Sequence, residues 1–509
     1  MDVTQILMLI TILVYLAAMV GIGAVLAKQN QTTDDFYLGG RTLGPLVTAM
    51  SAEASDMSSW LLMGLPGVAY LSGTADAAWT AIGLAIGTYV NWLVVAKRLR
   101  NYTHVCGNST TLPLFFSNRY RDNKRILSVI AALLIIIFFV PYTASGFAAC
   151  GKLFANLFGM DYLPAMLISA IVIVAYTTLG GFLAASTTDF VQSIVMTIAI
   201  VVVFGFGISK VGSFSAVMDN AKSMAGYFSL THTHDVATGT ASPYSLLQIF
   251  STLAWGLGYF GMPHVLLRFM AIGDANKLKL SRRVATVWVV ISMAVSVFIG
   301  VIGNAITKAG VLPTLKDPET IILVVADLIS KHGVLATIIA GLILAGILAA
   351  TMSTADSQLL AASSSASQNI LKEVFMKDMS EKTGMLIARI TVLVIALIGV
   401  FIARNPDSSV FQIVSFAWAG FGASFGPLVL LALFWKRSTF QGALCGMVSG
   451  GVMVFVWKFL IRPMGGALGI YELLPAFLLG LAVNVIVSLL TPAPSREVQD
   501  EFDKVASMK

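Results

Sequence analysis

The chain has 509 residues, of which 57% are apolar and only 11% are Asp, Glu, Lys or Arg, and its mean hydropathy is +0.86. Soluble domains carry about 25% charged residues, because a water-facing surface is built from them. A chain of soluble domains is therefore excluded, and most of the surface must face lipid. The three cysteines, Cys106, Cys150 and Cys445, lie far apart without a CxxC spacing, so we expect neither a disulfide framework nor a transition-metal site.

Stretches of about 20 apolar residues, long enough to cross the hydrocarbon core of a bilayer as a helix, recur along the whole chain. The first covers residues 6–27, and no basic residue precedes it, so it is interpreted as an uncleaved membrane helix rather than a signal peptide. We expect an all-α integral membrane protein of one domain with about thirteen transmembrane helices. The further predicted spans are 45–71, 78–96, 126–158, 163–181, 189–209, 244–271, 284–307, 333–362, 384–403, 408–435, 440–461 and 467–490.

The net charge of +7 could suggest a nucleic-acid partner, but the positions of the basic residues account for it differently. Loops rich in Lys and Arg remain in the cytoplasm. Seven basic residues lie in 97–125, and if this loop is inside, alternation of the spans places 21 basic residues inside and seven outside. We expect a multi-pass protein of the cell (plasma or inner) membrane, with its N-terminus outside, a cytoplasmic tail at 491–509 and no nucleic-acid partner.

Two of the predicted spans contain residues that weaken a helix. Ser51–Trp60 is a run of small and polar residues, and Trp255–His264 contains three glycines and a proline. In a helix interior Gly is less favourable than Ala by about 1 kcal/mol, and Pro by about 3 kcal/mol. Irregular backbone at membrane depth occurs only where it is buried in protein or lines a cavity. Each sequence taken alone is equally compatible with a proline kink or with close packing through small residues.

The positions of these two helices indicate an internal repeat. Residues 45–209 and 244–435 each hold five predicted spans, and the weakened helix comes first in both. An odd number of spans inverts the second unit relative to the first, and paired interrupted helices mark the central site of such transporters. We therefore predict alternating access around a site at the middle of the membrane, with the last two helices, 440–490, outside the repeats.

Three carboxylates fall within predicted spans: Asp56, Asp189 and Asp356. An ionisable side chain at that depth costs a few kcal/mol, so it is rarely present without a partner or a function. For Asp189, ion binding and a place at the cytoplasmic end of a helix are equally compatible with the sequence. Glu53 adds a second carboxylate beside Asp56, and its protonation state stays open.

A sodium site that joins two of these helices is a further hypothesis. Ser353 and Thr354 offer adjacent hydroxyl oxygens, and a broken helix at 51–60 would free the carbonyls of Ala54 and Met57. Carbonyls and helix ends of this kind coordinate Na⁺ in transporters. Ser and Thr in membrane helices often bond a carbonyl of their own helix instead, so the hydroxyl pair supports a site only together with the broken helix.

Five short motifs are more specific than the apolar pattern. They are Leu38–Arg41, Ala54–Ser58, Trp60–Gly67, Trp255–Gly261 with Pro263 and His264, and Met352–Thr354. With them, and over nearly the whole chain, the sequence resembles the sodium/solute symporter family, and within it the members that carry proline. The resemblance implies a LeuT-type fold of two inverted five-helix repeats, symport of Na⁺ with L-proline, no enzymatic activity and no obligate protein partner.

The resemblance also implies roles for particular residues. It implies that the sodium ligands are the carbonyls of Ala54, Met57 and Ala350 and the hydroxyls of Ser353 and Thr354. It implies that proline binds at Trp255, Tyr259 and Pro263, with Tyr142 as a further wall. The residues implied in coupling, or in binding a second ion, are Asp56, Ser58, Asp189, Asp356, Ser357 and Arg41.

The chemistry of proline is compatible with these residues. Its carboxylate suits the N-terminus of a half-helix, and its ring and ammonium suit an aromatic face such as Trp255 or Tyr259. The family has small residues where this chain has Glu53 and Ser59, and the proline carriers tend to have an uncharged residue at the position of Asp356. The coupling ion, the polarity of the site and the number of ions per cycle therefore stay open.

Other functions remain as alternatives. The nearest is a sodium symporter for another small solute, such as a different amino acid, a betaine or pantothenate. An ion channel, with the three aspartates along a pore, is a further alternative. A membrane-embedded enzyme is disfavoured, because no HExxH, GxSxG or His cluster lies in a span. His232 and His234 are expected in a solvated outer turn, and His264 is expected to pack rather than to bind a metal.

Overall fold

The structure, a computed structural model, describes residues 2–28, 32–376, 380–405 and 409–508, which are almost all helical. Lys377 and Lys509, two of the basic residues that alternation places inside, lie outside this part. The α-helices are α1 (Val3–Ala27), α2 (Thr33–Leu38), α3 (Pro45–Ser59), α4 (Leu65–Ser72), α5 (Thr74–Val90), α6 (Ala96–Val105), α7 (Leu112–Arg119), α8 (Ile126–Phe158), α9 (Tyr162–Val211), α10 (Phe214–Ser223), α11 (Leu246–Leu253), α12 (Pro263–Ala271), α13 (Leu278–Lys308), α14 (Ile321–Ser330), α15 (Val334–Ser364), α16 (Glu381–Ile402), α17 (Val410–Phe434), α18 (Phe440–Val456), α19 (Leu473–Leu490) and α20 (Arg496–Ser507). The strands are β1 (His232–His234) and β2 (Ala241–Pro243), and the short 3-10 and π segments include η2 (Trp60–Gly64), η3 (Asn91–Val95) and η4 (Ala254–Gly261).

Every predicted span overlaps a helix of the structure. Within the described residues, ten helices are long and apolar enough to cross a membrane. The other three predicted spans are the two interrupted helices and the short apolar helix Tyr162–Ala175. That helix is the first part of α9, which bends at Gly181, a glycine with φ 62° and ψ −170°. The prediction of an all-α membrane protein is confirmed, whereas the count of thirteen crossings stays a prediction.

Both weakened helices are interrupted in the structure, as predicted. α3 leaves helical geometry at Ser58 (φ 40°, ψ −174°), and the π turn η2 leads from it into α4. A positive φ is uncommon for a residue with a side chain, so the surrounding contacts must hold Ser58 in place. In the second helix, α11 gives way to the glycine-rich 3-10 segment η4, and Pro263 starts α12. Proline suits the first position of a helix, where its missing N–H costs no hydrogen bond.

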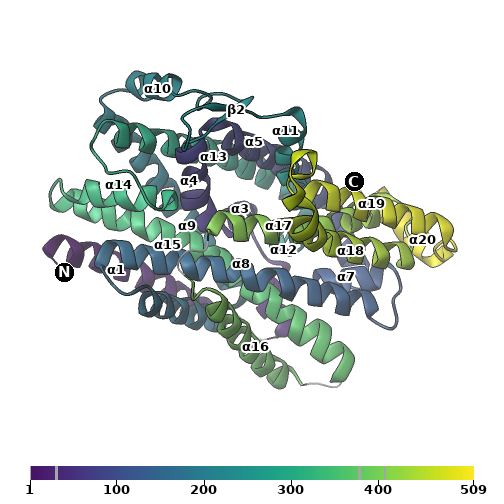
Figure 1. Cartoon of the computed structure of the whole chain (residues 1–509). Helices are drawn as coiled ribbons and strands as arrows, with labels where there is room; N and C mark the ends of the chain where they lie inside the picture. Colours follow the sequence, from purple (N-terminus) through teal and green to yellow (C-terminus); the bar gives the residue numbers. More distant parts are fainter. Residues whose placement is uncertain (1, 29–31, 377–379, 406–408, 509) are drawn as a thin grey trace.

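The two interrupted helices lie in the centre of the bundle. α3 contacts α9, α12, α13 and α15, and η4 contacts α5, α17 and α19. Figure 1 shows α3, α12 and α17 toward the middle of the molecule, and the amino terminus and α20 at opposite ends. The peripheral helices expose aliphatic side chains, among them Leu13, Ile171, Leu397 and Val452. An apolar exterior around interrupted, polar central helices is the arrangement of a multi-pass membrane protein.

Two segments outside the spans are more ordered than the sequence indicated. The expectation of a solvated turn at His232 and His234 is corrected by the structure, since they lie in β1, which pairs antiparallel with β2, rather than in a turn. The expected exposure to solvent is confirmed for His232, and His234 is half-buried. The tail 491–509 contains α20, which contacts α6 and buries Phe502 and Val505. Which side of the membrane each of these segments faces stays a prediction.

Glycines allow α5 and η4 to approach each other closely. A Cβ on Gly87 would lie 2.4 Å from the carbonyl oxygen of Gly256, and a Cβ on Gly256 would lie 2.2 Å from the carbonyl oxygen of Gly83. Both distances are far shorter than a van der Waals contact. The second interrupted segment therefore rests directly on the backbone of α5.

We expect Gly87→Ala to lower the free energy of unfolding by about 1–3 kcal/mol, the usual effect of overpacking. Thermal unfolding of the purified protein in detergent measures this as a lower melting temperature. Gly205→Ala is the matched control, since no atom of the described structure lies within 4 Å of where its Cβ would be. We expect Gly205→Ala to leave the free energy of unfolding unchanged or to raise it by up to about 1 kcal/mol, because Ala favours a helix. Equal melting temperatures for the two variants would contradict the close approach.

Candidate functional site

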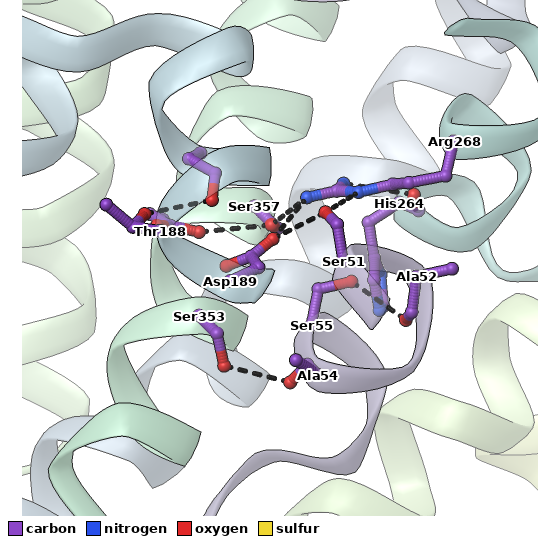
Figure 2. A network of polar contacts seen from close by, with 12 residues as sticks. Ser51, Ala52, Ala54, Ser55, Thr188, Asp189, His264, Arg268, Ser353 and Ser357 are labelled. Carbon is purple, nitrogen blue, oxygen red and sulfur yellow. Dashed lines mark hydrogen bonds and ion pairs between the residues drawn. The ribbon is translucent and has the colours of Figure 1, made fainter. Parts of the chain in front are cut away.

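The contact between the broken helix α3 and α15 joins residues that lie 299 positions apart. The Ser353 hydroxyl donates to the Ala54 carbonyl oxygen at 2.8 Å, and Figure 2 shows the two groups facing each other. The Ala350 carbonyl oxygen accepts from Ser353 at 3.2 Å and from Thr354 at 3.1 Å. All four residues are at most 3% exposed. Four of the five residues implied as sodium ligands therefore come together in one buried place.

The fifth residue, Met57, lies in the last turn of α3, directly before the break at Ser58. It is buried, and its carbonyl oxygen accepts the N–H of Trp60. A hydroxyl oxygen can still accept while it donates, and the Met57 carbonyl oxygen has a second lone pair, so the hydroxyls of Ser353 and Thr354 and this carbonyl keep lone pairs available. A group of neutral oxygen atoms beside an unwound turn suits a small monovalent cation.

A small cavity lies between the two interrupted helices. The Trp60 and Trp255 rings are 5.5 Å apart, and Trp418 donates its indole N–H to the Trp255 carbonyl oxygen at 2.8 Å. The cavity has a volume of only about 10 Å³, which is room for about one water molecule, so its walls must part before a solute of the size of proline can enter. Its lining residues are Asp56, Met57, Trp60, Leu84, Tyr142, Trp255, Met293, Val414 and Trp418.

Asp56 is held at the wall of this cavity through both its backbone and its side chain. The Tyr259 hydroxyl donates to the Asp56 carboxylate at 2.6 Å, and the Tyr142 hydroxyl donates to the Asp56 carbonyl oxygen at 3.2 Å. Of the residues implied for proline, Trp255 and Tyr142 line the cavity, and Tyr259 is connected to it through Asp56. Pro263 is buried at the start of α12 and does not belong to the lining set.

Trp60 and Trp418 are wall residues that the sequence reasoning missed. The Trp418 ring meets the Tyr259 ring edge to face, with 5.0 Å between the centroids. A signal was present, because Trp418 lies in the middle of a predicted span, among small residues such as Ala417 and Gly420. Tryptophan in membrane helices is otherwise concentrated at the interfaces, so a central Trp flanked by small residues points to a cavity wall.

A buried ion pair lies where a second ion was implied. The Arg268 guanidinium donates to the Asp189 carboxylate at 3.1 Å, to the Ser51 hydroxyl at 3.0 Å and to the Ser357 hydroxyl at 2.5 Å. Ser51 in turn donates to Asp189 at 2.6 Å. Figure 2 shows Arg268 reaching from α12 toward these residues. Since the side chains of Arg268 and Asp189 are at most 1% exposed, the protein itself supplies a positive charge beside Asp189 and Ser357.

Asp356 belongs to the same network, because the Ser357 hydroxyl donates to its carboxylate at 3.0 Å. Asp189 lies within α9, beyond its bend at Gly181, and is fully buried, so it does not occupy the helix end that the alternative gave it. Sequence reasoning missed Arg268 and treated it only as a basic residue within a span. The available signal was that a charge at membrane depth requires a partner.

Arg41 lies apart from the cavity and holds the segment before α3. Its guanidinium donates to the Met270 carbonyl oxygen at 2.6 Å and to the Ser109 carbonyl oxygen at 2.7 Å. Met270 lies in the last turn of α12 and Ser109 lies in the loop before α7. Arg41 thereby connects the segment before α3, the first interrupted helix, with the end of α12, the last part of the second.

The two residues that depart from the family pattern have different surroundings. Glu53 is buried and accepts the indole N–H of Trp92 at 2.8 Å. Ser59 lines a narrow second cavity, and polar side chains from three helices surround it. The polar lining residues of this cavity are Ser58, Ser59, Tyr142, Ser145, Thr351, Thr354 and Gln358.

His264 packs as expected, with its ring 5.6 Å from the ring of Phe139.

Residues 36–450 match the model of the sodium:solute symporter family. The chain belongs to this family. The osmoregulated proline transporter OpuE of Bacillus subtilis (strain 168) is 40% identical over 489 residues, 96% of each chain. The sodium/proline symporter of Escherichia coli (strain K12) is 41% identical over 500 residues, 97% of this sodium:solute symporter and 95% of the relative. The high-affinity proline transporter PutP of B. subtilis is 42% identical over 482 residues, 95% and 98% of the two chains.

Two solved structures share the fold of this sodium:solute symporter family member. A Na⁺-coupled sialic acid symporter in a substrate-bound outward-open state matches with a TM-score of 0.78 and 18% identity, over 96% of this chain and 99% of that one. Mhp1, a nucleobase-cation-symport-1 family transporter in a closed conformation, matches with a TM-score of 0.53 and 13% identity, over 92% and 98% of the two chains. The LeuT-type transporter fold is confirmed by these likenesses.

We expect Arg268→Gln to destabilise the protein by about 3–5 kcal/mol, because it leaves the Asp189 carboxylate buried without its cation. A large fall in melting temperature in detergent measures this loss. Arg404→Gln is the control, since Arg404 is exposed and its guanidinium lies over the Phe401 ring. For Arg404→Gln the free energy of unfolding should change by no more than about 0.5 kcal/mol. If both variants melt at the same temperature, the buried ion pair does not hold these helices together.

Proposed function

We propose that the protein imports L-proline together with Na⁺ by alternating access. The observation that carries the proposal is the set of buried oxygen atoms where α15 meets the broken helix α3. This set adjoins the aromatic cavity, because Met57 and Asp56 lie in the same turn of α3 and line that cavity. The relatives that are 40–42% identical over nearly their whole length are named as proline transporters, which favours proline over the other small solutes.

The proposed sodium site consists of the carbonyls of Ala54, Met57 and Ala350 and the hydroxyls of Ser353 and Thr354. The Ser353 hydroxyl donates to the Ala54 carbonyl, and the two groups are therefore close enough to share a cation. When Na⁺ enters, the Ser353 proton turns away, and both oxygen atoms face the ion. The ligands carry no formal charge, so their affinity is modest and the ion can leave on the other side of the membrane.

The proposed proline site is the aromatic cavity. The apolar ring of proline packs against Trp255 and Trp60, which form adjacent walls. The ammonium faces Asp56, whose carboxylate is oriented by the Tyr259 hydroxyl. The N-terminal end of the helix that resumes after the break at Ser58, through η2 into α4, suits the carboxylate. Tyr142 closes the cavity and also bonds the Asp56 backbone.

The two cargoes are coupled because both bind to the last turn of α3. The Ala54 carbonyl lies on the sodium side, and Asp56, two residues later, lies on the proline side of the same break. An ion that fixes the unwound turn also fixes Asp56 and, through it, Tyr142 and Tyr259. Each cargo then raises the affinity for the other by the same factor, as linkage requires.

Several further assignments belong to this proposal. The repeats are 45–209 and 244–435, the N-terminus lies outside, and the tail at 491–509 is cytoplasmic. The cargo crosses unchanged, so no residue is assigned a catalytic role. The residues assigned to coupling, or to organising the helices around the site, are Asp56, Ser58, Asp189, Asp356, Ser357 and Arg41.

The proposal is tested by uptake of radiolabelled L-proline into proteoliposomes that contain the purified protein. We expect uptake to require an inward Na⁺ gradient, to saturate, and to be inhibited by unlabelled proline more strongly than by other amino acids, betaine or pantothenate. K⁺ in place of Na⁺ should abolish accumulation. Saturable uptake distinguishes the symporter from a channel, and uptake that is indifferent to Na⁺ would refute the coupling.

Ser353→Ala tests the sodium site itself. We expect the Na⁺ concentration for half-maximal uptake to rise about tenfold, equivalent to about 1.4 kcal/mol, because one oxygen ligand is lost. At saturating Na⁺ the apparent affinity for proline should change much less. Ser209→Ala is the matched control, since the Ser209 hydroxyl also donates to a carbonyl of its own helix, at 2.7 Å, but is exposed. Equal effects of Ser353→Ala on the Na⁺ and proline requirements would count against the assignment.

A further inference from the structure

A third cavity, of about 250 Å³, is distinct from the proposed sodium and proline sites and lies between α1, α8, the first part of α9 and α15. α1 and α8 each pack against α9 and α15, and the cavity occupies the space between them. At its end toward the amino terminus of α1, the Gln5 side chain donates to the Leu157 carbonyl oxygen of α8 at 2.9 Å. Along α1 the lining extends from Leu9 to Leu16, which is about 10 Å at the helical rise per residue.

The lining of this third cavity is apolar. Every lining residue that the structure describes, except Cys150 and Ser169, has an aliphatic, aromatic or thioether side chain. The Ser169 hydroxyl already donates to the Ala165 carbonyl oxygen of its own helix, at 2.9 Å. A buried water molecule makes about three hydrogen bonds to polar groups, and this lining does not provide them. An unfilled space would deprive the walls of dispersion contacts, so the cavity suits an apolar occupant.

The mouth of the third cavity opens toward lipid. Leu13 of α1 and Ile168 of α9 belong to the lining and are each 53% exposed, so they lie at the mouth. The deeper lining residues, among them Ile12, Cys150 and Met352, are at most 1% exposed. α1 and the first part of α9 are apolar helices whose exposed faces meet the hydrocarbon core, which contains no water. A lipid chain is therefore the apolar group that reaches this mouth.

One wall of the third cavity belongs to the helix that carries the proposed sodium ligands. Leu348 and Met352 line the cavity from α15. Ala350 lies between them in the sequence, and Ser353 follows Met352 directly. Methionine has a flexible side chain that fills irregular gaps, so Met352 can turn into the cavity when nothing else occupies it. An occupant holds Met352 in place, and with it the turn of α15 that presents Ser353 to α3.

We propose that the third cavity is a lipid site: one unbranched hydrocarbon chain of a bilayer lipid occupies it and supports the turn of α15 that carries the proposed sodium ligands. With the amino terminus outside, as the basic residues predict, this lipid belongs to the outer leaflet. Four helices enclose the cavity, which suits a linear chain better than a branched one. Binding of the chain is independent of the proposed function, whereas its effect on Na⁺ rests on that function.

The first test identifies the occupant. The purified full-length protein is placed in nanodiscs of phosphatidylethanolamine and phosphatidylglycerol that include a phosphatidylethanolamine with a photoreactive diazirine in one chain. Mass spectrometry then locates the labelled residues, and we expect labels on buried lining residues such as Cys150 and Met352. Labels confined to exposed residues such as Ile171 and Leu397 would show bulk lipid only and overturn the inference. If the lining stays unlabelled and each nanodisc holds two copies of the chain, a second copy covers the cavity, which also overturns it.

A variant that fills the third cavity provides a matched comparison. Ala165 lines the cavity and is buried. We expect Ala165→Leu to lower the labelling of Cys150 and Met352 about fivefold, because the added side chain takes the space of the hydrocarbon chain. Ala175→Leu is the control, since Ala175 lies on the same helix but is exposed and outside the lining. Its labelling should equal that of the unmodified protein, and equal labelling of Cys150 in both variants would contradict the site.

The second test measures the effect of the chain on Na⁺. Proline uptake is compared in proteoliposomes of lipids with unbranched chains and of lipids with the same headgroups but methyl-branched phytanoyl chains. We expect the branched chains to raise the Na⁺ concentration for half-maximal uptake about fivefold in the unmodified protein and in Ala175→Leu. Ala165→Leu should respond equally to both lipids, because its cavity is already filled. A general effect of the bilayer would act on all three proteins, so the same shift in Ala165→Leu would overturn the inference.

The outcomes separate this inference from the proposed function. Photolabelling needs no transport, so it decides the lipid site whether or not the protein carries proline. Uptake that is indifferent to Na⁺ in lipids with unbranched chains would instead refute the proposed function. Melting temperatures of the variants, measured in the same detergent, show whether they fold. If Ala165→Leu does not fold, Ser169→Leu replaces it as the filling variant, because the Ser169 hydroxyl bonds a carbonyl of its own helix.

Discussion

The constraint that governs this structure is that backbone polar groups in the membrane must find partners within the protein. A break in a helix at membrane depth leaves carbonyl and N–H groups without their usual partners, and lipid cannot replace them. At Ser58 the chain leaves helical geometry, and the hydroxyl of Ser353 from α15 reaches the carbonyl of Ala54. The break therefore determines which helix must pack against it and which side chains that helix must carry. The same oxygen atoms that satisfy the broken backbone are those that a cation can share.

The second constraint is the position of Asp56. A carboxylate in the centre of a membrane protein requires donors, and here Tyr259 from the second interrupted helix supplies one. Tyr142 from α8 binds the backbone of the same residue. Three elements that belong to different parts of the chain thus converge on one turn of α3. A change in that turn, whether caused by an ion or by a solute, is transmitted directly to the wall of the cavity.

Much of this architecture is predictable from the sequence, because it depends on local properties. The length of the apolar stretches gives the spans, and the Gly, Ser and Pro content of 51–60 and 255–264 gives the two breaks. The pairing of Ser353 with Ala54, 299 positions apart, does not depend on local properties and was expected only from the family resemblance together with the broken helix. The partner of Asp189 does not follow, since Arg268 is 79 residues away and nothing local to either residue indicates the other. Trp418 was missed for the same reason, because a wall residue is defined by the packing of three helices.

The bundle has two polar centres, one where α3 meets α15 and one around Asp189. They differ in the charge of their groups, and this difference determines which of them suits an exchangeable ion. At Ala54, Ala350 and Ser353 the proposed ligands are neutral, so a cation would gain coordination without a strong Coulombic interaction and could be released. At Asp189 the counter-charge is the covalently attached guanidinium of Arg268, which also bonds Ser51 of α3 and Ser357 of α15. In a medium of low dielectric constant such a pair is costly to separate, because each charge would remain buried without its partner. Arg268 therefore fastens α3, α9, α12 and α15 together on one side of the break. On the other side, aromatic contacts such as Trp255 with Phe411 can part without leaving a buried charge.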